Sequence, residues 1–140
     1  MSKIILFILL ILTTKSHAFN FRMEGCLGSD LKKDYNFTLD DYVYNYLEFN
    51  FLEKEISINW KYNPETYKKH SEKGDESGSV YFDLFFYKDD LIKGVDLEED
   101  EIKRTITIFP KENRFEKTVT FVELERTFNI EYECLKTSKF

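Results

Sequence analysis

The stretch YVYNYLEFNFLEKEISINWKY, residues 42–62, decides the fold class because apolar and polar side chains alternate along most of it. In its first half the alternation places one set of apolar residues on one face, namely Val43, Leu47, Phe49 and Phe51. In its second half it groups Ile56, Ile58, Trp60 and Tyr62 opposite three polar residues. A period of two in segments rich in aromatic and β-branched residues is typical of β-strands. The stretch therefore predicts two half-buried strands.

The same alternation recurs along the chain, which gives about eight strand candidates. The further candidates are residues 19–23, 35–39, 80–87, 101–109, 115–124 and 127–134. Residues 63–79 are polar and predict a long loop, in which Asn63 and Pro64 would start at most a single helical turn. Residues 88–94 and 110–114 have the composition of turns. Many strands and little helix predict an all-β fold, namely an antiparallel β-sandwich of about seven or eight strands, with a small β-barrel as the alternative.

The amino-terminal residues have the order of a secretory signal peptide. Lys3 precedes nine apolar residues, 4–12, and the small residues Ser16 and Ala18 occupy the positions that a signal peptidase requires. We therefore predict a signal peptide over residues 1–18 and a single secreted domain over residues 19–140. Nine apolar residues are too few to span a bilayer as a helix, and no later stretch is long or apolar enough to do so. The expected location is extracellular, or periplasmic if the source is bacterial.

The charge of the chain argues against a nucleic-acid partner. Loss of Lys3 and Lys15 with the signal peptide changes the formal net charge from −6 to −8. A negative domain is repelled by phosphate backbones and by anionic lipid surfaces. The composition, 42% hydrophobic and 17% aromatic, is that of a folded globular domain and not of a disordered chain.

The two cysteines, Cys26 and Cys134, lie near the two ends of the predicted mature chain. In an exported protein such a pair is most simply a disulfide, here one that ties the first strand to the last. Lipid attachment at Cys26 is disfavoured because the residue lies well beyond the apolar segment, which ends at Leu12, and Glu24 precedes it. A thiol nucleophile is disfavoured because the mature chain offers a single histidine, His70, as its base.

No catalytic or metal-binding constellation stands out. One histidine and two paired cysteines cannot fill a zinc site, and the acidic run at residues 96–101 lacks the spacing of an EF-hand loop. We predict no metal and no cofactor. A small secreted hydrolase, with His70 or a pair of acids as its base, remains a third functional hypothesis behind two binding functions.

The tripeptide NFT at residues 36–38 is a sequon for N-linked glycosylation. On a eukaryotic secretory route it predicts a glycan on Asn36 and requires this residue to face solvent.

Surplus aromatic residues suggest where a partner would bind. With the apolar set of residues 42–51 in the core, Tyr42, Tyr44 and Tyr46 would form a stripe on the outer face, and Tyr81, Phe85 and Tyr87 would form another. Exposed aromatic patches often mark contact surfaces. The first hypothesis is therefore a non-enzymatic protein that binds a protein or glycan through an aromatic sheet face. The second is a carrier of a lipid or other apolar small molecule, which predicts a cavity between two sheets lined by residues such as Phe49, Trp60, Phe82 and Phe86.

Overall fold

The computed structural model of the chain describes residues 20–70, 74–96 and 100–139. The predicted signal peptide lies outside these residues. The strands are β1 (Phe21–Glu24), β2 (Leu27–Gly28), β3 (Tyr42–Asn50), β4 (Glu55–Tyr62), β5 (Ser77–Lys88), β6 (Leu91–Asp96), β7 (Ile102–Phe109), β8 (Arg114–Phe121), β9 (Arg126–Glu133) and β10 (Lys136–Lys139). The helical segments are α2 (Ser29–Tyr35), η1 (Leu39–Asp41), α3 (Pro64–Lys69) and η3 (Pro110–Glu112). None of the described helices has the length and apolarity needed to cross a membrane.

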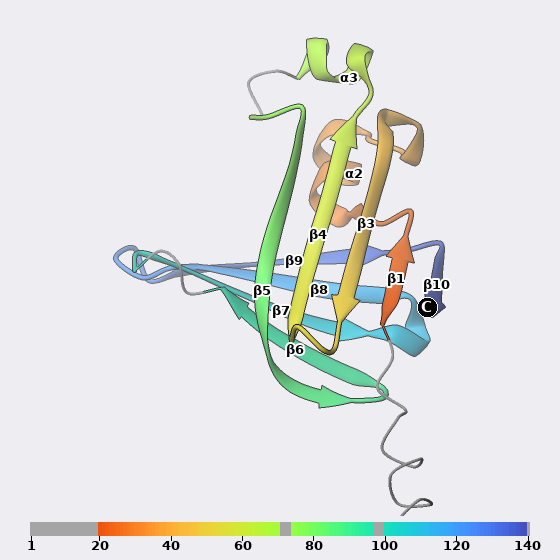
Figure 1. Ribbon diagram of the computed structural model, residues 1–140. Coiled ribbons are helices and arrows are strands. Elements are labelled where there is room, and N and C mark those ends of the chain that lie inside the picture. Colours follow the sequence, from red (N-terminus) through yellow and green to blue (C-terminus); the bar gives the residue numbers. More distant parts are fainter. Residues whose placement is uncertain (1–19, 71–73, 97–99, 140) are drawn as a thin grey trace, which may run out of the picture.

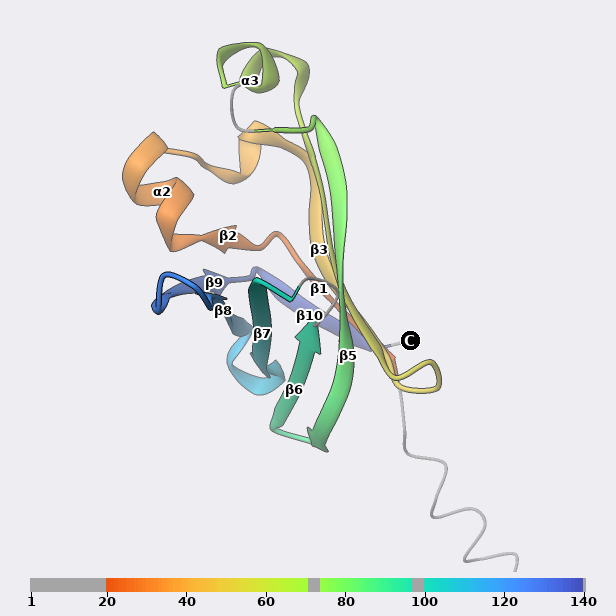
Figure 2. The same cartoon turned by 90° about the vertical axis from the view of Figure 1, so that its left-hand side faces the viewer.

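The strands form one curled antiparallel sheet of ten strands, in the order β10-β1-β3-β4-β5-β6-β7-β8-β9-β2. In Figure 1, β3, β4 and the first half of β5 lie roughly vertically and alternate in direction, whereas β6 to β9 run across them. Figure 2 shows that the second group folds over one face of the first. The all-β prediction is confirmed. The predicted sandwich is not, because the strands belong to a single sheet, whose half-barrel shape is compatible with the barrel-like alternative.

The long strand β5 carries the sheet around its bend. Its residues 77–83 pair with β4, and its residues 83–88 pair with β6, so one strand belongs to both groups. The register shifts between Leu84 and Phe86, where β5 contains a bulge. A bulge bends a strand and increases its twist, which allows β5 to turn from one group to the other (Figure 1).

The hydrophobic core fills the concave side of the curl. Its ten largest fully buried side chains are Phe21, Met23, Leu47, Phe49, Ile56, Phe82, Ile92, Ile106, Ile108 and Phe115. Gly94 allows β6 to pack closely here, because a Cβ atom at this position would lie 2.8 Å from Ile56 Cδ1 and 3.0 Å from Phe82 Cβ. This close approach explains a glycine inside a strand and also why residues 88–94 resemble a turn in the sequence.

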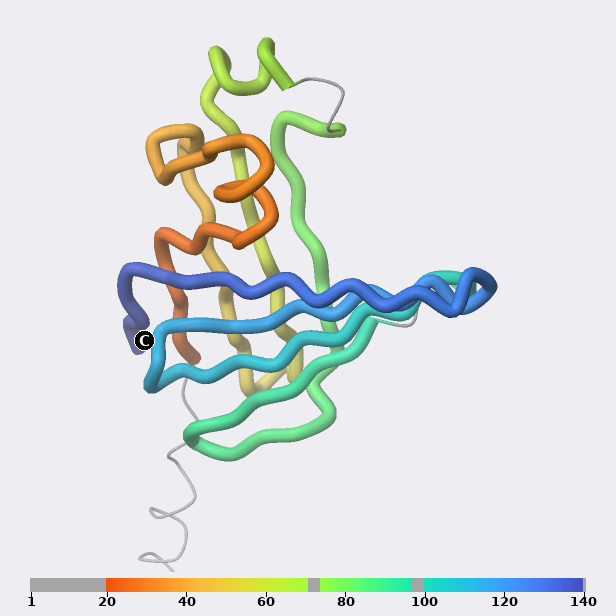
Figure 3. Tube along the Cα trace, turned by 180° about the vertical axis from the view of Figure 1, so that it is seen from behind, coloured from red at the N-terminus to blue at the C-terminus, as the bar shows by residue number. Residues whose placement is uncertain are grey.

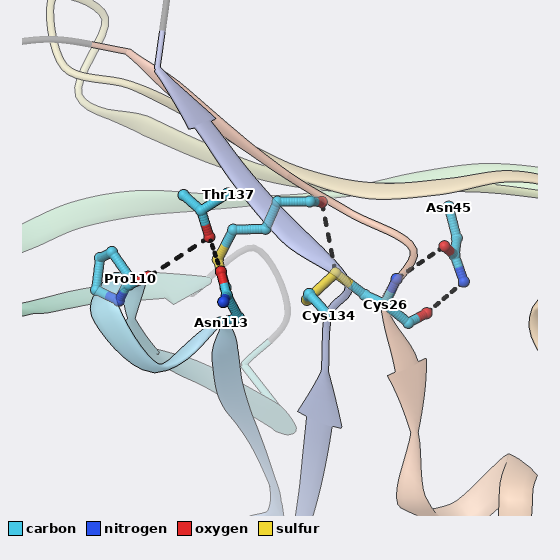
Figure 4. Close-up of a disulfide and its surroundings, with 7 residues drawn as sticks. Cys26, Asn45, Pro110, Asn113, Cys134 and Thr137 are labelled. Atoms are coloured by element: carbon cyan, nitrogen blue, oxygen red, sulfur yellow. Dashed lines mark hydrogen bonds between the residues drawn. A yellow bond between two sulfur atoms is a disulfide. The ribbon is translucent and has the colours of Figure 1, made fainter.

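The two ends of the chain meet at a corner that closes the sheet. Cys26 lies between β1 and β2, Cys134 lies between β9 and β10, and the two form the predicted disulfide. The Asn45 side chain holds this corner, since it accepts a hydrogen bond from the Cys26 backbone N–H at 2.9 Å and donates one to the Cys26 carbonyl (Figure 4). On the other side, the Thr137 hydroxyl donates to Asn113 Oδ1 at 2.7 Å.

Three local predictions differ from the structure. Residues 35–39, predicted as a strand, form the end of α2 and the start of η1. Residues 91–94, predicted as a turn, belong to β6. Residues 64–69 form α3, which is longer than the single helical turn predicted, while the predicted start is confirmed, since Asn63 Oδ1 caps the helix at 2.8 Å from the Thr66 N–H. Helix α2 has no fully buried residue, so no apolar stripe marks it in the sequence.

Candidate ligand-binding site

A cavity of about 160 Å³ lies on the concave side of the sheet, beneath α2. Figure 3 shows α2 above β9, where it covers the upper part of β3 and β4. The cavity is lined by Cys26, Leu31, Tyr42, Asn45, Tyr46, Ile58, Asn59, Trp60, Tyr62, Val80, Phe115, Lys117 and Tyr132. Its walls therefore come from α2, from β3 to β5, and from β8 and β9, which are far apart in the sequence.

Aromatic rings form two clusters in the walls of the cavity. In the first cluster, the rings of Tyr42 and Tyr62 lie 5.0 Å apart, and both contact the buried ring of Phe37 edge-on. In the second cluster, Tyr132 stacks on Phe115 with ring centroids 4.5 Å apart.

The indole of Trp60 contributes a further wall of the cavity. It lies over Gly78, where an added Cβ atom would be 2.6 Å from Trp60 Cζ2. Only glycine therefore leaves room for the indole in this position.

One charged residue, Lys117, lines the cavity. It lies on β8 two residues after Phe115, at a position where the alternation of the strand faces the interior. Its ammonium nitrogen lies 5.7 Å from the centroid of the Tyr132 ring. Within the described ranges it forms no hydrogen bond and no ion pair, although its neighbours Arg104 and Arg114 are paired with carboxylates.

Asp30 approaches the same region from α2. One of its carboxylate oxygens is buried without a hydrogen-bond partner among the described residues. Gly28 and Tyr132 lie beside it, since a Cβ atom on Gly28 would be 2.7 Å from Asp30 Oδ1 and 2.9 Å from Tyr132 Cε1. Asp30 is not itself a lining residue, so it acts on the cavity through its charge.

Burial changes the protonation chemistry of this region. It raises the pKa of the Tyr132 hydroxyl, and the charge of Asp30 raises it further. Burial, together with Tyr62, likewise raises the pKa of Tyr42. For Lys117 burial lowers the pKa; the carboxylate of Asp30 opposes this effect and Arg104 adds to it. Asp30 therefore favours the charged form of Lys117 and disfavours the ionised form of the tyrosines.

These shifts predict a loss of stability at alkaline pH. Above pH 10.0, the ordinary pKa of tyrosine, the unfolded chain releases a phenolic proton that folded Tyr132 retains. Stability then falls as pH rises, by about 1.4 kcal/mol per pH unit for this residue. Lys117 has a lowered pKa in the folded state, so its contribution makes stability rise with pH. This contribution ends above pH 10.5, the ordinary pKa of lysine. Urea unfolding between about pH 10.5 and pH 12 therefore isolates the tyrosines.

In this experiment Tyr132→Phe should have a shallower dependence on pH than the wild type. Tyr81→Phe, which replaces an exposed tyrosine, serves as the matched control. An unchanged slope in Tyr132→Phe would show that the Tyr132 hydroxyl ionises equally in both states.

A second, wider hollow of about 630 Å³ runs along the edge of β3. β1 pairs with residues 46–49 of β3, and the groove lies beside the part of β3 that extends beyond this pairing. Tyr44 and Tyr46 line it with their rings 5.8 Å apart, and Val43 and Leu135 add exposed apolar surface. The Arg22 guanidinium lies 4.3 Å over the Tyr46 ring. The groove thus has an aromatic floor and charged neighbours.

Two of the six aromatic residues predicted on the outer face point elsewhere. Tyr42 lines the cavity as well as the groove, because the register of β3 shifts between Tyr42 and Tyr44 and leaves Val43 exposed beside it. Tyr87 packs on the core and stacks on Phe49 with centroids 5.7 Å apart, because the bulge in β5 reverses the alternation after Leu84. The other four lie outside the core: Tyr44, Tyr46, Tyr81 and Phe85.

The cavity expected for a carrier differs in position from the one observed. Trp60 lines the cavity as predicted, whereas Phe49 and Phe82 belong to the filled core. Phe86 lies within 6 Å of the ammonium groups of Lys88 and Lys93.

Sequence reasoning missed Lys117 and Tyr132, although a lysine between Phe115 and Val119 on one strand face is a signal of the kind that marks a functional site.

Asn36 is exposed and has a left-handed backbone conformation, with φ of 53°, at the end of α2. Its position thus meets the requirement of solvent exposure, and glycosylation stays a prediction.

His70 ends α3 and packs against aromatic rings, with centroids 5.1 Å from Phe37 and 5.7 Å from Tyr35. In the part of the chain that the structure describes, no group of three or more His, Cys, Asp or Glu residues could hold a metal ion. Residues 97–99 of the acidic run lie outside that part.

The chain matches no protein-family model, and neither the curated proteins nor the solved structures include a significant match to it.

Proposed function

We propose that this protein is an exported, non-enzymatic binding protein that holds a small amphipathic molecule in the cavity beneath α2. The observation that carries the proposal is a cavity with aromatic walls and one lysine, Lys117, that forms no ion pair among the described residues. Ligand sites are typically apolar hollows in which a few polar groups converge. A cavity of about 150 Å³ accommodates benzene, so a volume of about 160 Å³ suits one ring or a short chain.

Export is part of the proposal. The apolar leader has the order of a signal peptide, and the disulfide fits an oxidising compartment, where such bonds persist.

A second candidate function is the binding of a protein or glycan along the groove on β3. The supporting observation is the aromatic floor of that groove, formed by Tyr44 and Tyr46. Tyrosine is frequent in binding surfaces because it offers a large amphipathic area with little loss of conformational entropy. Of these two tyrosines, Tyr44 lines the groove and not the cavity, whereas Tyr46 lines both.

One pair of variants separates the two candidates. Val80→Phe adds a ring to the wall of the cavity and should abolish binding of benzyl alcohol, a probe of suitable size. Val43→Phe adds the same ring in the groove and should leave that binding unchanged. Trp60 is the only tryptophan of the chain and lines the cavity, so its fluorescence reports binding directly. Wild-type protein whose Trp60 signal does not respond to benzyl alcohol would contradict the cavity proposal. Binding of a protein or glycan partner in the groove should be weakened by Val43→Phe and left unchanged by Val80→Phe.

A further inference from the structure

The charge of the residues around the cavity restricts its ligand. Lys117 is the single charged side chain among the lining residues. Its ammonium group carries three N–H donors and forms no hydrogen bond or ion pair among the described residues, and Tyr62 and Tyr132 also line the cavity. Lys117 is half-buried, and a ligand that brings acceptors would give its donors hydrogen-bond partners.

Charged groups on the neighbouring elements are consistent with this restriction. On β7, Arg104 is paired with Asp96 at 3.4 Å, and at the start of β8, Arg114 is paired with Glu116 at 3.1 Å. On α2, Asp30 favours the ammonium form of Lys117 without lining the cavity. Lys117 therefore offers a positive charge to the cavity, while the neighbouring arginines already have carboxylate partners.

The apolar lining residues restrict the rest of the ligand. Ile58 and Trp60 on β4 and Val80 on β5 present apolar surface to the cavity, and Phe115 lies two residues before Lys117 on β8. A ligand that satisfies both Lys117 and this apolar surface has an anionic end and a compact apolar end.

We infer that Lys117 binds the carboxylate of a small organic acid whose ring or short chain lies against Trp60 and Phe115. This inference rests on the proposed function, because it names the ligand class of the same cavity. A carboxylate accepts charge-assisted hydrogen bonds from an ammonium group, which are stronger than bonds between neutral groups. An amine ligand would meet the positive charge of Lys117 instead.

The experiment compares three probes that share one ring: benzoate, benzyl alcohol and benzylamine. Calorimetric titration of the wild type at neutral pH should give an affinity for benzoate about tenfold to a hundredfold above that for benzyl alcohol. Lys117→Met should lose this preference and retain benzyl alcohol binding. Lys103→Met, which removes an exposed lysine from β7, is the matched control and should behave as the wild type.

The outcomes distinguish the role of Lys117 from the presence of a ligand site in the cavity. Equal affinities for benzoate and benzyl alcohol, or a preference for benzylamine, would overturn the role of Lys117 and leave the cavity as a ligand site. Failure of all three probes to bind would overturn both the role of Lys117 and the cavity as a ligand site. If Lys117→Met does not fold, the pH titration of the wild-type NMR signal of the Lys117 Cε group decides the question: benzoate should raise the pKa of Lys117 and benzyl alcohol should not, and a pKa that rises with both probes or with neither overturns the inference.

Discussion

Replacing Cys26 and Cys134 together with serine should lower the free energy of unfolding by up to about 4.7 kcal/mol. The two residues are separated by 108 positions, so the disulfide restricts the unfolded chain over nearly all of its described length. In the chain-entropy account, a longer closed loop gives a larger stabilisation. Urea unfolding of the oxidised wild type and of the double variant measures this difference directly.

The loss should be concentrated at the corner that the disulfide closes. Amide hydrogen exchange is expected to accelerate most in β1, β2 and β10, whose pairings meet at Cys26 and Cys134. Strands β4 to β7 pair with neighbours in sequence and should be less affected. Wild-type protein in reducing agent is the control for the serine substitutions. Equal stability of the oxidised and reduced proteins would show that the strand pairings alone hold the corner.

Replacing Phe82 with alanine should destabilise the fold by about 3–5 kcal/mol. Phe82 is 1% exposed, lies opposite Ile56 on β4, and packs beside Gly94 on β6. Its removal leaves a cavity in the core where the two groups of strands meet, and close packing limits how far the neighbours can refill it. Thermal or urea unfolding measures the change.

Phe85 provides the matched control, since it lies on the same strand with 59% of its surface exposed. Phe85→Ala should change stability by no more than about 0.5 kcal/mol. Similar losses in the two variants would contradict the assignment of Phe85 to the outer face.

Alternation of residue types was sufficient to predict most of the strands, because a half-buried strand imposes a period of two on its own sequence. Strand β6 was missed because Gly94, required by the close packing on Ile56, gives its sequence the composition of a turn. Helix α2 was missed because it has no fully buried side chain and so lacks an apolar stripe. In both cases the cause is a tertiary contact, or the lack of one, that local patterns do not record.

The faces of β3 and β5 were predicted correctly on one side of each bulge and incorrectly on the other, namely before the bulge in β3 and after it in β5. One additional residue reverses which side chains point inward, and this is why Tyr42 and Tyr87 lie on the interior side. The choice between a sandwich and a curled sheet depends on which strands share hydrogen bonds, and the period of two is the same in both. The cavity brings Lys117 on β8 near Asp30 on α2, a long-range juxtaposition that no local pattern specifies.

The strand order also has a consequence for how the chain folds. From β3 to β9 every pairing joins strands that are consecutive in sequence, so this meander consists of local contacts that form at little entropic cost. The pairings of β1 with β10 and of β2 with β9 instead bring together opposite ends of the chain. Because such long-range contacts form slowly, we expect the closing corner to assemble last. The disulfide would then secure a meeting of the two ends that strand pairing has already brought about.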